Sequence, residues 1–320
     1  MKITRNDVAR KANVSPSTVS LILNGKTNHF NPETVKNVKK IAKELGYSPN
    51  KIARALKTGK SNIVTLWCSG ITSPYMGAVI KNIQKSLIPY KYDLIIKDIE
   101  NIDRVQDEIY VDGIIAYDCL DYTEKYLDKT NSKIPIVSAG MSFSEKLDNV
   151  TFDFNNGFVD GYNSLVNLGC KNIAYFTPYL NEEEQRYILY KHRTKKHKFK
   201  EYIISFNEQG SYENIMDSLK NCHFLKELDG IYCYNDYNAI ILMRCLHELG
   251  YKVPKDLKII STDNMYLCDY SVPSLSSIAI PIEKVCETVV EFLINRINNP
   301  KIKIQKKVFS STFIERESSK

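Results

Sequence analysis

Long apolar runs are missing from this 320-residue sequence, and their absence argues against a membrane-spanning protein. No stretch reaches the roughly 20 apolar residues of a membrane-spanning helix, and the start, MKITRNDVAR, has no apolar secretory core. We therefore expect a cytoplasmic protein that does not enter membranes. The 8 cysteines stand singly, without a C-x-x-C pair, which favours buried free thiols over disulfides or a metal site.

Catalytic motifs are also missing. The sequence has no phosphate-binding loop, no G-x-G-x-x-G fingerprint of dinucleotide binding and no G-x-S-x-G nucleophile elbow. Its five histidines do not stand at ligand spacing with carboxylates or cysteines. We expect no enzymatic activity, no catalytic residue, no cofactor and no metal.

Positive charge is concentrated at one end of the chain. Residues 1–60 hold 13 Lys and Arg against 3 Asp and Glu, whereas the remainder holds 31 basic and 34 acidic residues. A small basic module beside a larger, slightly acidic body predicts a polyanion partner such as nucleic acid. The length predicts two or three domains.

Three short helices are expected in the basic module, over 5–12, 16–24 and from 32 onward. Ser15 is a good N-cap and Pro16 suits the first helical position, while Asn31 caps the third helix. Small hydroxyl residues stand at the start of the second helix, and its apolar Val19 and Ile22 point inward. This pattern is typical of a helix-turn-helix. A three-helix bundle that is merely basic is the alternative.

The segment NDVARKANVSPSTVSLILNGK carries D-V-A-x-x-A-x-V-S-x-x-T-V-S-x-x-x-N from Asp7 to Asn24. Over residues 3–64 the chain resembles the DNA-binding head of the lactose/galactose repressor (LacI/GalR) family of bacterial transcriptional regulators. The resemblance implies major-groove base contacts by Pro16, Ser17 and Leu21, and phosphate contacts by Ser15, Thr18, Ser20 and Asn24. Because Leu21 suits thymine methyl groups, we hypothesise an operator rich in A·T where it docks.

The stretch SPNKIARALKTGKSN, residues 48–62, starts like a helix and stops at Gly59, too short to be stable alone. The resemblance implies a hinge helix that forms against DNA and its symmetry mate, with Leu56 wedged into the minor groove. The residues it assigns to DNA here are Ile52, Ala53, Arg54, Leu56 and Lys57. A plain linker is the alternative.

From residue 62 onward, strands alternate with helices. Strands are expected in NIVTLWC, YDLIIKD, DGIIAYD, IPIVSAG, NIAYFTP, KEYIISF, DGIYCYN and LKIISTD. VDGIIAYD at 111–118 echoes LDGIYCYND at 228–236, which predicts two similar halves that hold a ligand at the carboxyl ends of their strands. The body resembles the family's effector domain. The expected fold is therefore an all-α helix-turn-helix head plus an α/β periplasmic-binding-protein-like domain of two Rossmann-like subdomains.

The resemblance implies effector binding by Tyr75, Arg186, Asn235, Asp236 and Asp263. Other roles remain open for some of them: Asp236 as a helix cap, Arg186 and Asp263 as an ion pair, Tyr75 as a surface residue.

The sequence departs from the family at Gly140, where an acidic residue is usual, and at Leu189 and Ile280. The effector is accordingly a hexose, a purine, a phosphorylated sugar or none. The basic run KHRTKKHKFK at 191–200 is either a solvated face or an anion-attracting rim near Arg186.

These observations predict a head at 1–47, a hinge helix and linker at 48–61, and an effector-binding and dimerisation domain at 62–320. We expect a transcriptional regulator, most simply a repressor, that binds a pseudo-palindromic double-stranded DNA operator as a homodimer. A sugar-like small molecule between the subdomains would control it. The alternatives are a solute-binding protein with an N-terminal extension and an α/β enzyme such as a sugar kinase.

Overall fold

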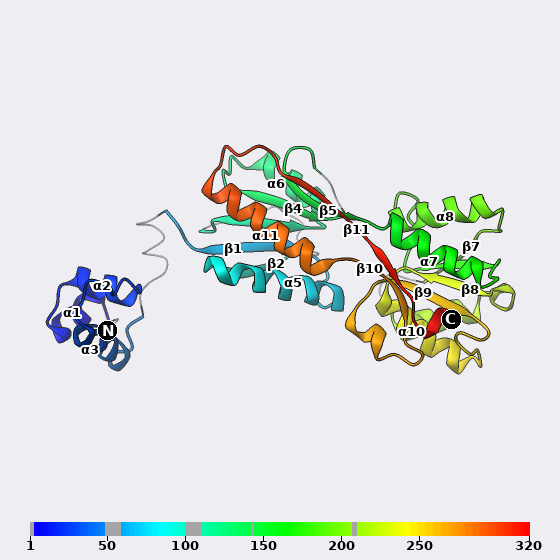
Figure 1. Ribbon diagram of the computed structural model, residues 1–320, viewed down its shortest axis with the longest axis horizontal. Helices are drawn as coiled ribbons and strands as arrows, with labels where there is room; N and C mark the ends of the chain where they lie inside the picture. Colours follow the sequence, from blue (N-terminus) through cyan, green and yellow to red (C-terminus); the bar gives the residue numbers. More distant parts are fainter. Residues whose placement is uncertain (1–2, 49–58, 100–109, 142–143, 207–209) are drawn as a thin grey trace. The chain divides into compact units, whose positions relative to one another are not determined.

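The computed structural model describes residues 3–48, 59–99, 110–141, 144–206 and 210–320 (Figure 1). Contacts divide the chain into two units, one of residues 1–63 with 108–112 and one of the rest. No helix in the described ranges is long and apolar enough to cross a membrane.

The first unit contains the three expected helices, α1 Arg5–Ala12, α2 Pro16–Leu23 and α3 Pro32–Glu44. Their starts follow from capping, because Ser15 Oγ accepts from the Thr18 N–H at 3.0 Å and Asn31 Oδ1 from the Glu33 N–H at 2.9 Å. The helix-turn-helix prediction is confirmed. One small core joins the three helices: Val8, Ala9, Ala12, Val19, Ile22, Val38, Ile41 and Ala42.

The second unit contains two six-stranded sheets, and the first has the order β11-β5-β4-β3-β1-β2. Its strands are β1 Ile63–Cys68, β2 Asp93–Asp98, β3 Gly113–Tyr117, β4 Ile136–Gly140, β5 Asp148–Asp153 and β11 Lys306–Ser310. Helices α5 Pro74–Leu87 and α11 Ile282–Asn298 cover one face of this sheet and share a core with Leu66. Helix α6 Leu120–Lys129 covers the other face and packs against Trp67.

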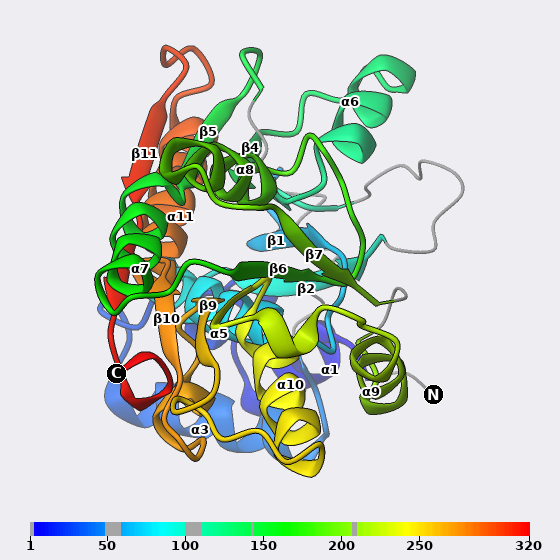
Figure 2. The same ribbon diagram turned by 90° about the vertical axis from the view of Figure 1, so that its right-hand side faces the viewer.

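The second sheet has the order β12-β10-β9-β8-β6-β7, with β12 antiparallel to β10. Its strands are β6 Ile173–Thr177, β7 Tyr202–Ser205, β8 Gly230–Cys233, β9 Lys258–Asp263, β10 Ser276–Ala279 and β12 Thr312–Ile314. Figure 2 shows α7 Asn155–Asn167 and α8 Gln185–His197 on one side of this sheet and α9 Tyr212–Lys220 and α10 Asp236–Glu248 on the other. Short 3-10 turns complete the unit at Ile88–Tyr90, Leu225–Glu227, Tyr266–Asp269 and Glu317–Ser319.

The chain passes between the two sheets at three places in its described part. Strand β5 leads into α7, β10 leads into α11, and β11 leads into β12. The eight strands expected from the sequence are all present, and the periplasmic-binding-protein-like fold is confirmed. Strands β5, β10, β11 and β12 were not anticipated.

The two echoing segments make matching hydrogen bonds. The Asp112 carboxylate accepts from the backbone N–H groups of Ser61 and Asn62, at 2.7 and 2.9 Å. The Asp229 carboxylate accepts from Lys171 and Asn172, at 2.9 and 3.0 Å. Each aspartate precedes a strand and anchors the start of its neighbour, so the sequence echo reflects a repeated structural role.

Candidate functional site

Three hydroxyl groups meet at the N-terminus of α2. Ser15 Oγ lies 2.7 Å from Ser17 Oγ and 2.9 Å from Thr18 Oγ1, and it also caps the helix. The N-terminal end of a helix carries partial positive charge and unpaired N–H groups, which favour phosphate. The structure therefore brings three of the predicted DNA-binding residues together where an anion would be attracted.

Farther along α2, Leu21 is 40% exposed while Val19 and Ile22 are fully buried, so Leu21 lies on the solvent side. Asn24 Nδ2 donates to the carbonyl of Ser20 at 2.6 Å and fixes the end of the helix. Pro16 is half-buried at the first helical position. The exposed side of α2 thus combines small polar groups with one aliphatic side chain.

The predicted hinge residues Ile52, Ala53, Arg54, Leu56 and Lys57 lie outside the described residues. Their role stays a prediction.

Arg186 lies buried at the start of α8, with 4% exposure. Its Nε donates to Glu184 Oε1 at 2.6 Å and its Nη1 to the Tyr234 carbonyl at 3.0 Å. The guanidinium also stacks on the Tyr234 ring, 3.5 Å from its centre. Its ion-pair partner is therefore Glu184, and the suggested pairing with Asp263 is replaced by a charge interaction without a hydrogen bond.

Asp263 ends β9 with a positive φ of 110° and is 9% exposed. In the described part of the chain no hydrogen-bond donor reaches its carboxylate. Burial raises its pKa well above the ordinary value, the charge of Asp236 raises it further, and Arg186 opposes the shift. The carboxylate oxygens of Asp263 are not among the buried side-chain atoms that lack a hydrogen-bond partner, so solvent reaches them.

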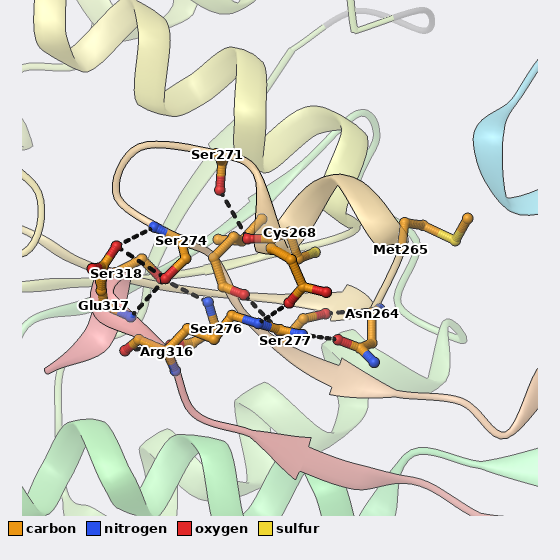
Figure 3. Close-up of polar contacts among 12 residues, drawn as sticks. Asn264, Met265, Cys268, Ser271, Ser274, Ser276, Ser277, Arg316, Glu317 and Ser318 are labelled. Carbon is orange, nitrogen blue, oxygen red and sulfur yellow. Dashed lines mark hydrogen bonds and ion pairs between the residues drawn. The ribbon is translucent and has the colours of Figure 1, made fainter.

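Asp236 is the centre of a buried hydrogen-bond network. Its carboxylate accepts from the hydroxyls of Ser261 and Ser277 and from the Met265 N–H, the last at 2.6 Å. Figure 3 shows polar contacts in this part of the second sheet, among them those of Ser277 and Asn264. Burial raises its pKa, and these hydrogen bonds oppose the rise. The network positions the backbone that follows Asp263.

Asn235, and not Asp236, caps α10, because Asn235 Oδ1 accepts from the Asn238 N–H at 2.9 Å. The suggestion that Asp236 serves as the helix cap is therefore wrong. Arg316 extends the network, with Nη2 donating to Asn264 Oδ1 and Nε donating to Asp269, both at 2.8 Å.

In the first sheet, Tyr75 at the start of α5 and Tyr117 at the end of β3 share a hydrogen bond between their hydroxyls, 2.6 Å apart. Burial raises the pKa of Tyr75, and the charges of Asp118 and Asp263 add to the rise. Tyr75 is therefore half-buried and paired with Tyr117, and it is not a free surface residue.

Asp118 follows β3, and its Oδ1 accepts from the Met141 N–H at 2.6 Å. A Cβ on Gly140 would overlap this carboxylate, so Asp118 occupies the space of the side chain that Gly140 lacks. The other two departures are apolar: Ile280 is buried, and Leu189 packs against the core.

A cavity of about 510 Å³ lies between the edge of the first sheet and the start of α8, and none of the five predicted effector residues lines it. Its volume is in the range of small-molecule sites. It is lined by Met141, Thr151, Phe152, Asp153, Glu183, Glu184, Gln185, Ile188 and Val308.

The basic run at 191–200 does not adjoin Arg186. Arg186 is at the start of α8 and Lys195 is near its end, nine residues and about 14 Å along the axis. Lys195 and Lys196 are exposed to solvent. This separation and exposure favour the solvated face for Lys195 and Lys196, and the anion-attracting rim stays a prediction.

The 8 cysteines are free and seven are buried, as expected. Burial raises the pKa of Cys68 to about 11 and that of Cys119 to about 12, which keeps both thiols protonated and unreactive. Among the described residues, no group of three His, Cys, Asp or Glu side chains is arranged to hold a metal ion.

Sequence reasoning missed Tyr117, Asp118 and Glu184. The echo could have found the first two, since aligning VDGIIAYD with LDGIYCYN places them opposite Tyr234 and Asn235. Glu184 had no such signal, because its pairing with Arg186 depends on its place as the N-cap of α8.

Two family models match parts of this chain. Residues 4–50 match the model for bacterial regulatory proteins of the lacI family, and residues 162–319 match the periplasmic binding protein-like domain. Catabolite control protein A of Staphylococcus xylosus is 29% identical over 315 residues, covering 94% of each chain.

Two solved structures share the fold. The lac repressor dimer bound to operator and an anti-inducer has a TM-score of 0.78 at 19% identity, covering 100% of this chain and 99% of that one. A LacI-type regulator from Alkaliphilus metalliredigens in complex with D-xylulofuranose has a TM-score of 0.68 at 24% identity, covering 80% and 98%.

Proposed function

We propose that the chain is a transcriptional regulator of the lacI family that binds a pseudo-palindromic operator as a homodimer under small-molecule control, because its head matches that family's model and its whole length resembles catabolite control protein A. The observation that carries the proposal is the hydroxyl-lined N-terminus of α2 on a strongly basic head. The family consists of DNA-binding regulators, and we assign the chain no enzymatic reaction. It would act where the operator is, in the cytoplasm.

In the head, we assign base contacts to Pro16, Ser17 and Leu21. We assign phosphate contacts to Ser15, Thr18, Ser20 and Asn24. The support is their common exposed side of α2 and the capping geometry at its positive end.

The DNA function is tested by selecting binding sites for the full-length protein from a random duplex library. Enriched sites should show two inverted half-sites, and log affinity should fall steeply and linearly with log salt concentration. No enrichment after several rounds would contradict the proposal.

We retain residues 48–61 as a hinge helix between a head at 1–47 and a body at 62–320. Leu56 is assigned to the minor groove, with Ile52, Ala53, Arg54 and Lys57 beside it. Leu56→Ala should abolish specific operator binding while thermal stability and ligand binding stay unchanged. If that variant binds the selected operator normally, the segment is a linker.

The effector is placed among Tyr75, Arg186, Asn235, Asp236 and Asp263. The support is the family resemblance and the near burial of Asp263, at the end of β9, and of Arg186, at the start of α8, which are 9% and 4% exposed. A sugar-like ligand suits these polar groups, and a protein of the same fold is known with D-xylulofuranose. A thermal-shift screen of sugars, with Asp263→Asn as the control, tests this placement.

Repression is the simplest output for a regulator of this kind. A reporter gene placed behind a selected operator should be more active in a strain without the protein. Reduced reporter activity in that strain would identify an activator instead.

A further inference from the structure

The ends of strands β4 and β9 share a backbone conformation that favours glycine. The two strands hold the same place in their sheets, whose orders are β11-β5-β4-β3-β1-β2 and β12-β10-β9-β8-β6-β7. Gly140 ends β4 with a φ of 104°, and Asp263 ends β9 with a φ of 110°. Glycine adopts such a φ readily, whereas a residue with a side chain is strained there. The second half of the body therefore keeps an aspartate where the first half uses glycine.

The strain continues into the next residue. Asn264 also has a positive φ, of 55°, so two consecutive residues with side chains adopt uncommon conformations. A strained backbone persists only where the surrounding contacts hold it, and such positions cluster at functional sites. Asp263 is a proposed effector residue, and the contacts that hold this turn therefore decide where its carboxylate points.

The first support of the turn comes from within the second sheet. The Asn264 N–H donates to Ser277 Oγ at 3.0 Å, and the Met265 N–H donates to Asp236 Oδ2 at 2.6 Å. Ser277 Oγ in turn donates to Asp236 Oδ1 at 2.6 Å. These hydrogen bonds fix the backbone N–H groups that follow Asp263 and leave the side chain of Asn264 to another partner.

Arg316 supplies that partner. Its Nη2 donates to Asn264 Oδ1 at 2.8 Å, its Nη1 to the Leu275 carbonyl at 2.9 Å and its Nε to Asp269 Oδ1 at 2.8 Å. One planar guanidinium thus joins the start, the middle and the end of the loop between β9 and β10. Only 15% of the Arg316 side chain is exposed, so water screens these bonds little.

The backbone around Arg316 is anchored as well. The Arg316 N–H donates to Ser276 Oγ at 2.7 Å. Glu317 accepts from the Ser274 N–H at 2.8 Å, and Ser318 Oγ accepts from the Ser276 N–H at 2.9 Å (Figure 3). Ser318 is fully buried. The guanidinium is therefore carried by a fixed segment and can act as a rigid brace for the loop.

We infer that Arg316 is a positioning residue for the proposed effector site. It holds the strained turn at Asp263 and Asn264, and the turn aims the Asp263 carboxylate at a ligand. The hydrogen bonds of the Arg316 side chain go to Asn264, Asp269 and Leu275, so its effect on Asp263 passes through the backbone of the turn. The inference rests on the proposed effector site and adds a residue on which the affinity of that site depends.

The first test measures whether Arg316 and Asp263 are coupled in the full-length protein. Arg316→Met should lower the urea midpoint of unfolding. Asp263→Gly should cut that shift by at least about half, because glycine needs no support at a positive φ. Arg244→Met is the matched control, since it breaks an exposed pair with Glu248 on α10, and its shift should be the same in both backgrounds. Equal shifts for Arg316→Met in the two backgrounds overturn the inference.

The second test measures sugar affinity, which a contact that only stabilises the fold would leave unchanged. Calorimetry uses D-glucose, D-galactose, D-ribose and glucose 6-phosphate, so that neutral and phosphorylated sugars are both covered. Arg316→Met should weaken at least about tenfold the binding of each sugar that the natural protein binds, and Arg244→Met should leave it unchanged. Equal affinity in Arg316→Met and the natural protein overturns the positioning role.

Arg316→Lys replaces Arg316→Met if the latter does not fold. A lysine ammonium cannot make all three side-chain bonds of the guanidinium, so smaller changes in the same directions are expected. If none of the four sugars binds the natural protein, the proposed effector site is at fault, and the unfolding midpoints still decide whether Arg316 holds the turn.

Discussion

The Asp118 carboxylate occupies the space that a side chain on Gly140 would need. Gly140 has a φ of +104°, and a Cβ built there would overlap Asp118 Oδ1. The same oxygen accepts from the Met141 N–H at 2.6 Å. The ends of the neighbouring strands β3 and β4 therefore fit together, because the carboxylate that follows β3 fills the space left by the glycine that ends β4.

The first prediction concerns this pair. Gly140→Ala should lower the free energy of unfolding through both backbone strain and overlap with Asp118, about 1–3 kcal/mol from strain alone. Gly169→Ala is the matched control, since Gly169 has a φ of +93° with open space around its Cβ position. Denaturant unfolding of both variants separates the strain from the overlap. Equal losses of unfolding free energy in the two variants would refute the overlap. In the background Asp118→Ala, Gly140→Ala should lose only as much unfolding free energy as Gly169→Ala does.

The second prediction is that Asp263→Asn stabilises the protein. Removing a buried carboxylate without a hydrogen-bond partner should raise stability at pH 8 by about 1 kcal/mol or more, or about 2–4 °C in Tm. Calorimetric melting of the ligand-free protein measures it. A lower Tm at pH 8 would mean that Asp263 has a stabilising partner.

The pH dependence of that gain has a definite sign. The folded-state pKa of Asp263 lies above its unfolded value, so the folded state binds the extra proton. Stability of the natural protein then falls as pH rises from about 4 to the folded-state pKa. The advantage of Asp263→Asn should be small near pH 4 and grow toward pH 8, whereas a constant difference would exclude the titration of Asp263 as its cause.

The third prediction compares a buried with an exposed ion pair. Arg296 donates from Nε and Nη2 to both oxygens of Asp148, at 2.9 and 2.8 Å, and only 1% of the Asp148 side chain is exposed. Arg296→Met leaves that charge uncompensated and should cost about 3–5 kcal/mol. Lys85→Met breaks the exposed pair with Glu283 and should cost less than about 1 kcal/mol. Chemical denaturation measures both, and similar losses would disprove the difference.

The fourth prediction separates base reading from phosphate contact. Leu21→Ala should weaken binding most to operators with A·T at the contacted positions and leave the salt dependence unchanged. Ser20→Ala should weaken binding by a similar factor for all sequences. The affinity of each variant is measured by titration with the selected operator and with operators that carry single-base substitutions. A uniform loss in Leu21→Ala would remove the thymine-methyl assignment.

Several strands found from sequence, such as β1, β3 and β4, are buried on both faces and read as continuous apolar runs. Strand β2 was found although it is largely exposed at a sheet edge, because LII still forms an apolar run. Strand β5, DNVTFD, escaped recognition because Asp148 and Asn149 are buried polar residues. Arg296, the partner of Asp148, lies far along the chain, whereas Asn149 binds the backbone of Ser144 just before the strand. Strand β11 is largely exposed at a sheet edge, so its composition carries no burial signal.

The head was predictable almost to the residue, because its helices are set by local capping at Ser15 and Asn31. The ligand residues were harder to place. Arg186 and Asp263 could be named from the family resemblance, but the partner of Arg186 and the acid opposite Gly140 depend on how distant strands meet. Neighbouring strand ends bring together residues that have no fixed spacing in the sequence.

The chain passes between the two sheets at three places, and this affects how the gene can be truncated. Helix α11 and strand β11 complete the first sheet although they follow most of the second sheet in the sequence. Neither half of the body is therefore a contiguous stretch of codons. A stop codon after β5 would remove an edge strand and a covering helix from the first half, so no C-terminal truncation can express that half intact.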